Sequence, residues 1–495
     1  MNEKTAEQDI AALAKGGRTN FLGFLLRLAA RIPFLIIAGR LYSAEGADAL
    51  GRFASAMVAI ELAGQLCTLG QKRGLALRLS QDDAPAANIV ADGMVMSLLI
   101  ATVLAGLLYL FPLPMFPSGQ YTEFDRLLPL ALFPATMTDI ALAALAYRYD
   151  VATTVRSRSV VEPWALSITA GAMFFILPQS GLAIAFIASI FASAVVALVP
   201  LWRSYGTPQH WRPNPLRIGK LALASLPLAA ADVVEWGTRK LDIAILGAFA
   251  SPAAVGVYWA AQQIASLPQK LKTSFEPILG PVITRNLKEG NYHAIAQQVC
   301  QVGFWIIAAQ AGIALALGIP GEGVMGLVGP QFVGGTGALT FLLAAEVVAA
   351  TAVVSEAALI YVRRIGNLWV SLGTIALQAV LTVAGIELVD HLGLSQLYRA
   401  SAAAAALMIS LGLASIIKAR MLGRFLGEPV NAWRWPLVWA AAPAVLIGWF
   451  ATRFLPEWAE LALGIPAILL SYGWIIWHKG FGPEDRVLFR KNVGG

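Results

Sequence analysis

Ionisable side chains in the middle of long apolar segments are the part of this sequence that could do chemistry, because a charge in an apolar medium is costly and usually functional. Arg27 and Arg31 are four residues apart, so they share one face of a helix. No acidic residue lies within a turn of them. Such a pair needs water, an anionic ligand or a carboxylate from another helix. We therefore predict either direct contact with an anionic ligand or ion pairs with Glu61 or Asp139.

A second group of charges follows one helix face further along the chain. At 100° per residue its members fall within an arc of about 80°: Asp232, Glu235, Arg239 and Asp242. Lys240 lies off this arc, and Lys270 continues the basic pattern in the next apolar segment. Such a face cannot contact acyl chains, so we predict that it lines a water-filled cavity or contacts the next helix. The alternative is that Glu235 and Arg239, an i,i+4 pair, neutralise each other.

The two signs of charge predict two kinds of site. Fixed cations suit phosphate oxygens in a medium of low dielectric constant, and a desolvated carboxylate can exchange a proton near neutral pH. The predicted substrate-binding residues are Arg27, Arg31, Arg239, Lys240 and Lys270. The candidates for proton or sodium coupling are Glu61, Asp139, Asp232, Glu235, Asp242 and Glu346. For each carboxylate the alternative is a hydrogen bond that packs two helices.

Composition identifies the medium in which these charges lie. The chain has 495 residues, of which 58% are hydrophobic and 13% are charged. Soluble domains carry about 25% charged residues, so the composition excludes a water-soluble enzyme, a disordered scaffold and a nucleic-acid binder. Only helices or closed barrels span a bilayer, and the long apolar runs show no strand-like alternation. We therefore predict an all-α polytopic membrane protein.

The apolar runs divide the sequence into spans, because a bilayer core of about 30 Å needs about 20 apolar residues of helix. We predict fourteen transmembrane helices, at 20–41, 48–69, 89–111, 127–147, 160–178, 181–201, 221–248, 254–283, 297–319, 333–361, 367–389, 396–417, 436–455 and 460–477. The loops between them are short, so no soluble domain fits on either face of the membrane.

Lys and Arg residues concentrate in alternate loops, which fixes the orientation of the spans because basic residues near span ends stay in the cytoplasm. The intervening loops hold few, all at span edges: Arg40, Arg52, Arg126, Arg399 and Arg453. Both termini are therefore predicted to be cytoplasmic. In this orientation the net charge of +7 faces anionic lipid and does not indicate nucleic acid.

Two segments of the chain are alike, 37–56 and 245–261. In each, an apolar-Gly pattern ends one span, a turn of small residues follows, and the next helix opens with Gly-x-aromatic at Gly51 or Gly256. Small residues let helices approach closely in lipid. The offset of six spans predicts a parallel repeat that holds substrate between two rocking halves, although chance similarity is the alternative. The predicted segments are 1–210 (spans 1–6), 211–422 (spans 7–12) and 423–495 (spans 13–14 and tail).

Four short segments carry a family resemblance: 14–20 (AKGGRTN), 38–42 (AGRLY), 51–54 (GRFA) and 69–74 (LGQKRG). They resemble polysaccharide biosynthesis flippases of the multidrug/oligosaccharidyl-lipid/polysaccharide (MOP) exporter superfamily, and the layout of six, six and two spans is similar. The resemblance implies a V-shaped, MATE/MurJ-like pair of pseudo-symmetric six-helix bundles with two further helices, in a bacterial inner membrane. It also implies transport of undecaprenyl-diphosphate-linked sugar units for lipopolysaccharide or O-antigen.

Motifs of other chemistries are missing from the sequence. Cys67 and Cys300 both lie in apolar stretches, so neither a disulfide framework nor a zinc site is predicted. The four histidines do not pair at metal-ligand spacing, and no Gly-x-x-x-x-Gly-Lys-[Ser/Thr] phosphate loop is present. External acidic residues are scattered on short loops. We therefore expect no metal, no cofactor and no catalysis.

These features predict a flippase for lipid-linked oligosaccharide. Its sugar–diphosphate head would enter a hydrated, cationic cavity while the polyprenyl tail stays in lipid, and a glycan polymerase or glycosyltransferases are the expected partners. The first alternative is a sodium- or proton-coupled multidrug or metabolite exporter of the same superfamily, which would need an acidic cavity for cationic drugs. The second is a non-transporting partner of a glycan polymerase complex, in which the buried charges are structural pairs.

Overall fold

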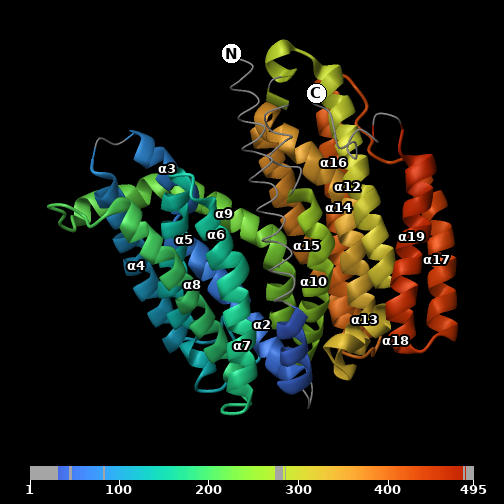
Figure 1. Ribbon diagram of the computed structural model, residues 1–495, viewed down its shortest axis with the longest axis horizontal. Coiled ribbons are helices and arrows are strands. Elements are labelled where there is room, and N and C mark those ends of the chain that lie inside the picture. The colour runs from blue at the N-terminus through green and yellow to red at the C-terminus, as the bar shows by residue number, and fades with distance from the viewer. Residues whose placement is uncertain are drawn as a thin grey trace. The chain divides into compact units, whose positions relative to one another are not determined.

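The computed structural model describes residues 32–43, 47–81, 84–273, 283–284, 286–482 and 485, without the side chains of 267–273. All regular secondary structure in these ranges is helical (Figure 1), which confirms the all-α prediction. The chain forms two compact units, a first unit, Met1–Gly256, and a second unit, Val257–Gly495. The segments expected from the repeat, with boundaries after 210 and 422, stay a prediction.

The first unit is a helical bundle centred on α5, which packs against α2, α3, α4 and α8. The buried residues of α5 are distributed around the whole helix, where Ile140 and Leu145 fill space and Ala141 and Ala144 let neighbouring helices approach. Its elements are η1 (Ile37–Leu41), α2 (Asp48–Thr68), α3 (Gln71–Gln81), α4 (Ala86–Leu110), η2 (Asp125–Ala131), α5 (Leu132–Tyr147), α6 (Val151–Thr154), η3 (Val155–Val161), α7 (Glu162–Phe174), α8 (Gly181–Tyr205) and α9 (Pro215–Phe249). Helix α9 packs along α2, and α7 along α8.

Helices α2 and α10 (Pro252–Thr273) approach each other at two glycines. A Cβ on Gly51 would lie 1.6 Å from the carbonyl oxygen of Pro252, and a Cβ on Gly256 would lie 2.3 Å from that of Ala47. Both distances are far inside van der Waals contact, so a larger residue at either position would force the backbones apart. These are the two Gly-x-aromatic glycines of the sequence repeat, and in the structure they lie against each other.

A left-handed turn separates α2 from α3. Leu69 (φ 42°) and Gly70 (φ 70°) both adopt the left-handed backbone conformation. A Cβ on Gly70 would lie 2.3 Å from the Cβ of Leu228, so the missing side chain also lets α9 approach the turn. Helix α3 then begins at Gln71, which places the two following basic residues, Lys72 and Arg73, in its first turn and close to α9.

The second unit packs α14 between α12 and α16, with α15 against α16 and the pair α17 and α19 against α12. Its largest apolar cluster contains buried residues of all of these helices except α15, and includes Phe304 and Tyr472. After α10 its elements are α12 (Tyr292–Gly318), α13 (Gly321–Val328), η4 (Pro330–Gly335), α14 (Thr336–Val362), α15 (Arg364–His391), α16 (Leu397–Leu426), α17 (Pro436–Phe454), α18 (Glu457–Ala459), η5 (Glu460–Gly464), α19 (Ile465–Ile475) and η6 (Ile476–Gly480).

Ten helices within the described ranges are long and apolar enough to cross a membrane, which confirms a multi-pass membrane protein. Each of the ten overlaps one of the predicted spans. The predicted spans at 221–248 and 254–283 are helical in their described parts, and 160–178 is helical as far as Phe174, but none of the three is among the ten. The predicted span 20–41 lies mostly outside the described residues. The count of fourteen therefore stays a prediction.

We expect Gly51→Ala to destabilise the protein, because its methyl group would overlap the Pro252 carbonyl oxygen and separate α2 from α10. Overpacking of this kind costs about 1–3 kcal/mol, and thermal unfolding in detergent measures it. Gly64→Ala on the same helix is the control, since a Cβ at that position meets nothing within 4 Å. Equal melting temperatures for the two variants would contradict the close contact.

Candidate functional site

The charged face of α9 is partly buried in the first unit and partly exposed. Asp232 and Asp242 are buried, whereas the side chains of Glu235 and Arg239 are 44% and 54% exposed. Arg239 Nη2 lies 2.8 Å from Glu235 Oε1, so the i,i+4 pair that the sequence offers as an alternative is formed. Asp242 Oδ1 accepts a hydrogen bond from the backbone N–H of Ile243. The charged face of α9 thus combines one exposed internal ion pair, Glu235–Arg239, with two buried acids, Asp232 and Asp242.

Arg73 of α3 neutralises two carboxylates of α9. Its Nε lies 3.1 Å from Asp232 Oδ1, and its Nη2 contacts Glu235. Glu235 therefore lies between two guanidinium groups, those of Arg73 and Arg239. The left-handed turn before α3 makes this contact possible, because it brings the first turn of α3 beside α9.

A second ionic cluster centres on Asp139 of α5. Lys72 Nζ lies 2.8 Å from one carboxylate oxygen of Asp139, and Arg158 of η3 contacts the other. Arg158 also pairs at 2.6 Å with Glu162, one helical turn further on. Ser193 Oγ of α8 donates a hydrogen bond of 3.2 Å to the same Glu162 oxygen. Asp139 is thereby held by two cations, as a structural carboxylate is.

Lys240 lies outside the charged face of α9, and its Nζ lies 3.3 Å from Glu61 Oε2 of α2. With the groups above it completes the charge network of the first unit, which comprises Glu61, Lys72, Arg73, Asp139, Arg158, Glu162, Asp232, Glu235, Arg239 and Lys240. The carboxylates and cations of this charge network balance in formal charge. All the carboxylates come from α2, α5, α7 and α9, so the charge network links four helices.

Lys72, Arg73 and Arg158 are not among the site residues predicted from the sequence, because they belong to the basic residues of the alternate loops that are predicted to be cytoplasmic. The aliphatic part of a basic side chain can extend along apolar surface, so a residue at a span end can set orientation and also reach a carboxylate within a helix. Two signals in the sequence point to them. Segment 69–74 carries part of the family resemblance, and Arg158 has the i,i+4 spacing from Glu162.

Other predicted site residues lie elsewhere. Arg27 and Arg31 lie outside the described residues, as does the side chain of Lys270. Glu346 lies half-buried in α14 of the second unit. The diphosphate contact and the coupling roles stay predictions.

The second unit holds its own buried ion pair. Lys418 of α16 is 5% exposed, and its Nζ lies 3.0 Å from Glu356 Oε2 of α14 and 3.2 Å from Ser371 Oγ of α15. Asn367 Nδ2 donates a hydrogen bond to the other oxygen of Glu356. Here too a basic side chain of one helix pairs with a carboxylate of its neighbour.

The exposed part of the charge network has the chemistry to bind an anion. The side chains of Arg73 and Arg239 are 50% and 54% exposed. A guanidinium group has five N–H donors, and the carboxylates use only some of them. The remaining donors suit phosphate oxygens. Within the described ranges, no group of His, Cys, Asp and Glu side chains could hold a metal ion.

One family model matches the sequence over more than half of its length. This model, described as polysaccharide biosynthesis protein, matches residues 44–308. The matched region contains the whole charge network. No curated protein matches the sequence.

Solved structures share the fold at low sequence identity. The lipid II flippase MurJ, in an inward closed conformation, matches with a TM-score of 0.69 and 13% identity over 95% of this chain and 100% of its own. A multidrug resistance MATE family transporter of the MOP superfamily, in an inward-facing conformation, matches with a TM-score of 0.65 and 15% identity over 81% of this chain and 98% of its own. A MOP superfamily transporter from Pyrococcus furiosus, for which a binding pocket of reverse polarity is described, matches with a TM-score of 0.56 and 14% identity over 84% of this chain and 96% of its own.

We expect Asp139→Asn to lower the free energy of unfolding by about 1.5–3 kcal/mol, because Lys72 and Arg158 lose the carboxylate that neutralises both. Thermal unfolding of the purified protein in detergent measures the loss. Glu123→Gln is the control, since that side chain is 87% exposed and lies 3.8 Å from Arg126. An exposed pair contributes about 0.5 kcal/mol. A loss for Asp139→Asn no larger than that of the control would show that Asp139 is not a structural centre.

Proposed function

We propose that this chain, which belongs to the polysaccharide biosynthesis protein family, moves undecaprenyl-diphosphate-linked oligosaccharide units across the bacterial inner membrane. The units would serve the synthesis of surface polysaccharide or lipopolysaccharide. One observation carries the proposal: Arg73 and Arg239 present half-exposed guanidinium groups on either side of a single carboxylate, in a protein otherwise built from apolar helices.

The family and the fold support a transporter with a lipid-linked substrate. The solved structures of this fold include multidrug transporters and, separately, the lipid II flippase MurJ. Transporters built from repeats alternate access by moving one half against the other around the bound substrate. We infer the same cycle here, with the sugar–diphosphate head in a hydrated, cationic cavity and the polyprenyl tail in lipid.

The diphosphate would be held by the predicted cations and by one further arginine: Arg27, Arg31, Arg73, Arg239, Lys240 and Lys270. Glu235 lies between two of these groups, so it would keep Arg73 and Arg239 in position when no substrate is bound. A diphosphate that displaces the Glu235 carboxylate would receive N–H donors from both guanidinium groups at once. The exchange leaves neither cation unpaired at any stage.

Coupling to protons or sodium would fall to the more exposed carboxylates. Glu235 and Glu61 are 44% and 40% exposed, so a cation from water reaches them first. Asp139 is held by Lys72 and Arg158, and we assign it a structural role. The remaining candidates are the buried Asp232 and Asp242 of α9 and the half-buried Glu346 of α14.

A sodium- or proton-coupled exporter of drugs or metabolites is the second candidate, and the balanced charge network favours it. Each cation of the charge network is paired with a carboxylate, so the charge network itself presents no excess of positive charge. A cationic substrate would bind Glu61 and Glu235 and leave the arginines as their structural partners. A non-transporting partner of a glycan polymerase complex would also keep every pair intact and would move no substrate in reconstituted membranes.

The double change Arg27→Ala with Arg31→Ala tests the diphosphate site in cells that depend on this chain. We expect surface polysaccharide to fall by about tenfold or more, because charge-assisted contacts to the diphosphate are lost. Lys4→Ala with Lys15→Ala is the control, since these basic residues precede the first predicted span. Normal polysaccharide at a normal level of the variant protein would contradict an anion-binding role for the arginine pair.

The exchange at Glu235 predicts opposite effects for two neighbouring residues. We expect Glu235→Gln to tighten the binding of a short-chain prenyl diphosphate by about tenfold, and Arg239→Gln to weaken it by a similar factor. Calorimetric titration of the purified protein measures both. Glu123→Gln, far from α9 in the sequence, should leave affinity unchanged. Weaker binding to Glu235→Gln would show that this carboxylate does not compete with the ligand.

A further inference from the structure

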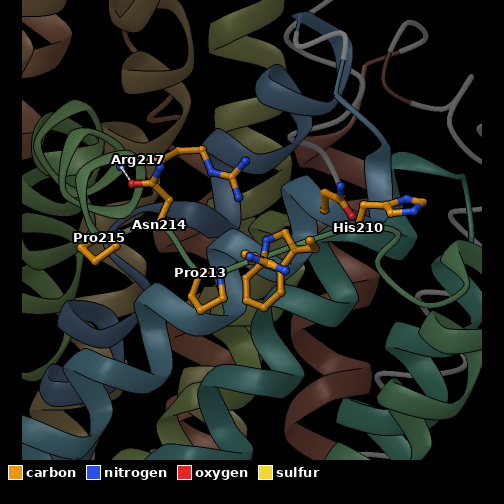
Figure 2. Close-up of a pocket in the computed structure, with 8 residues that line it drawn as sticks. His210, Pro213, Asn214, Pro215 and Arg217 are labelled. Carbon is orange, nitrogen blue, oxygen red and sulfur yellow. Dashed lines mark hydrogen bonds between the residues drawn. The ribbon is translucent and has the colours of Figure 1, made fainter.

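The loop between α8 and α9 borders a hollow of about 530 Å³ in the first unit (Figure 2). The lining residues come from this loop, from the first turn of α9 and from the first turn of α4: Asn88, His210, Trp211, Arg212, Pro213, Asn214, Pro215 and Arg217. None of these described lining residues is acidic. The hollow contains no member of the charge network and requires its own explanation.

The loop that forms the hollow has a preset backbone. Pro208, Pro213 and Pro215 each fix φ near −65°. Gly206 (φ 72°) and His210 (φ 50°) lie in the left-handed region, where a histidine is strained. Strain of this kind persists only where the surroundings fix the conformation, and it gathers at binding sites.

Helix α4 fixes the loop at two points one turn apart. Asn88 and Gln209 exchange two hydrogen bonds, each of 3.1 Å, between the side-chain amide and the backbone. Asp92, which is 3% exposed, accepts hydrogen bonds from Trp211 Nε1 at 2.9 Å and from Arg217 Nη2 at 2.6 Å. A buried carboxylate therefore holds one aromatic and one cationic side chain of the rim in place before any ligand arrives.

The cationic donors at the hollow are guanidinium groups. Arg212 is exposed and, in the part of the chain that the structure describes, has no hydrogen-bond or ion-pair partner. The side chain of Arg217 is 45% exposed, and its Nη2 donates to Asp92 Oδ1. The N-terminus of α9 adds little, because Asn214 Oδ1 already accepts from the N–H groups of Leu216 and Arg217. Two cations with unused donors thus share a rim whose lining residues include no acid, and the buried Asp92 behind the rim is already bonded to Trp211 and Arg217.

We propose that this hollow binds the phosphate group of an anionic phospholipid or of a soluble phosphate ester, held by Arg212 and Arg217. Guanidinium groups bind phosphate oxygens in pairs of parallel hydrogen bonds. Exposed apolar side chains beside the loop in the chain, Trp202 at 67% and Leu216 at 70%, suit the acyl region of a lipid. Basic pockets at the cytoplasmic ends of membrane helices are sites for anionic headgroups.

Native mass spectrometry of the full chain in detergent tests the proposal with phosphatidylglycerol as the probe and phosphatidylcholine as the zwitterionic reference. We expect the wild-type protein to retain phosphatidylglycerol preferentially. Arg212→Gln should weaken that binding by about tenfold, and Arg212→Lys should restore part of it because the charge returns. Lys220→Gln, which removes an exposed cation of α9 outside the hollow, should leave binding unchanged.

A competition arm separates the two sources of phosphate. Displacement of phosphatidylglycerol by millimolar inorganic phosphate supports a soluble ester as ligand, and resistance to displacement supports the lipid. Arg212 has no partner to lose, so its variants should elute from a sizing column as the wild-type protein does. The proposal is overturned if phosphatidylglycerol and phosphatidylcholine bind equally, or if Arg212→Gln and Lys220→Gln weaken binding to the same extent.

Discussion

A carboxylate among apolar helices must have a cation beside it, and the first unit is organised by this constraint. An unpaired charge in a membrane interior costs several kcal/mol. Each carboxylate of the charge network is paired with a lysine or arginine, and three of these cations, Lys72, Arg73 and Arg158, come from α3 and η3. Moving one of the helices would therefore leave a buried charge without its partner. The Lys418–Glu356 pair applies the same rule in the second unit.

The backbone makes these pairings possible at a few points of close approach. The left-handed turn at Leu69 and Gly70 lets α9 lie against the start of α3, and Arg73 then reaches two acids of α9. A site assembled in this way can present cations to a diphosphate while each cation keeps an anionic partner and no unpaired charge faces lipid. Glu235 pairs with both guanidinium groups in the structure, and in the proposed cycle the substrate would replace this carboxylate with another anion. In this way the structural pairing and the proposed transport use the same residues.

The sequence predicts the helices well because long apolar runs in a chain this poor in charge have no other stable structure in lipid. It also predicts the Glu235–Arg239 pair, since i,i+4 spacing is a local property. The pairings of Arg73 and Arg158 with acids of other helices depend on tertiary contacts, and no local spacing encodes them. Gly51 of the repeat indicates that another helix approaches closely at that position. The sequence pattern does not predict that the Pro252 carbonyl is the group that lies there.

Reconstitution of the purified protein in liposomes measures whether it transports a lipid-linked oligosaccharide. Liposomes would carry an undecaprenyl-diphosphate-linked oligosaccharide in the inner leaflet, and an impermeant glycosidase outside would report each sugar that crosses. Flipping by the protein would give fast cleavage in vesicles that contain it and slow cleavage in protein-free vesicles. We also expect no acceleration for the same sugar on an uncharged lipid. Equal rates with and without protein, or equal acceleration for the uncharged lipid, would contradict the proposed transport.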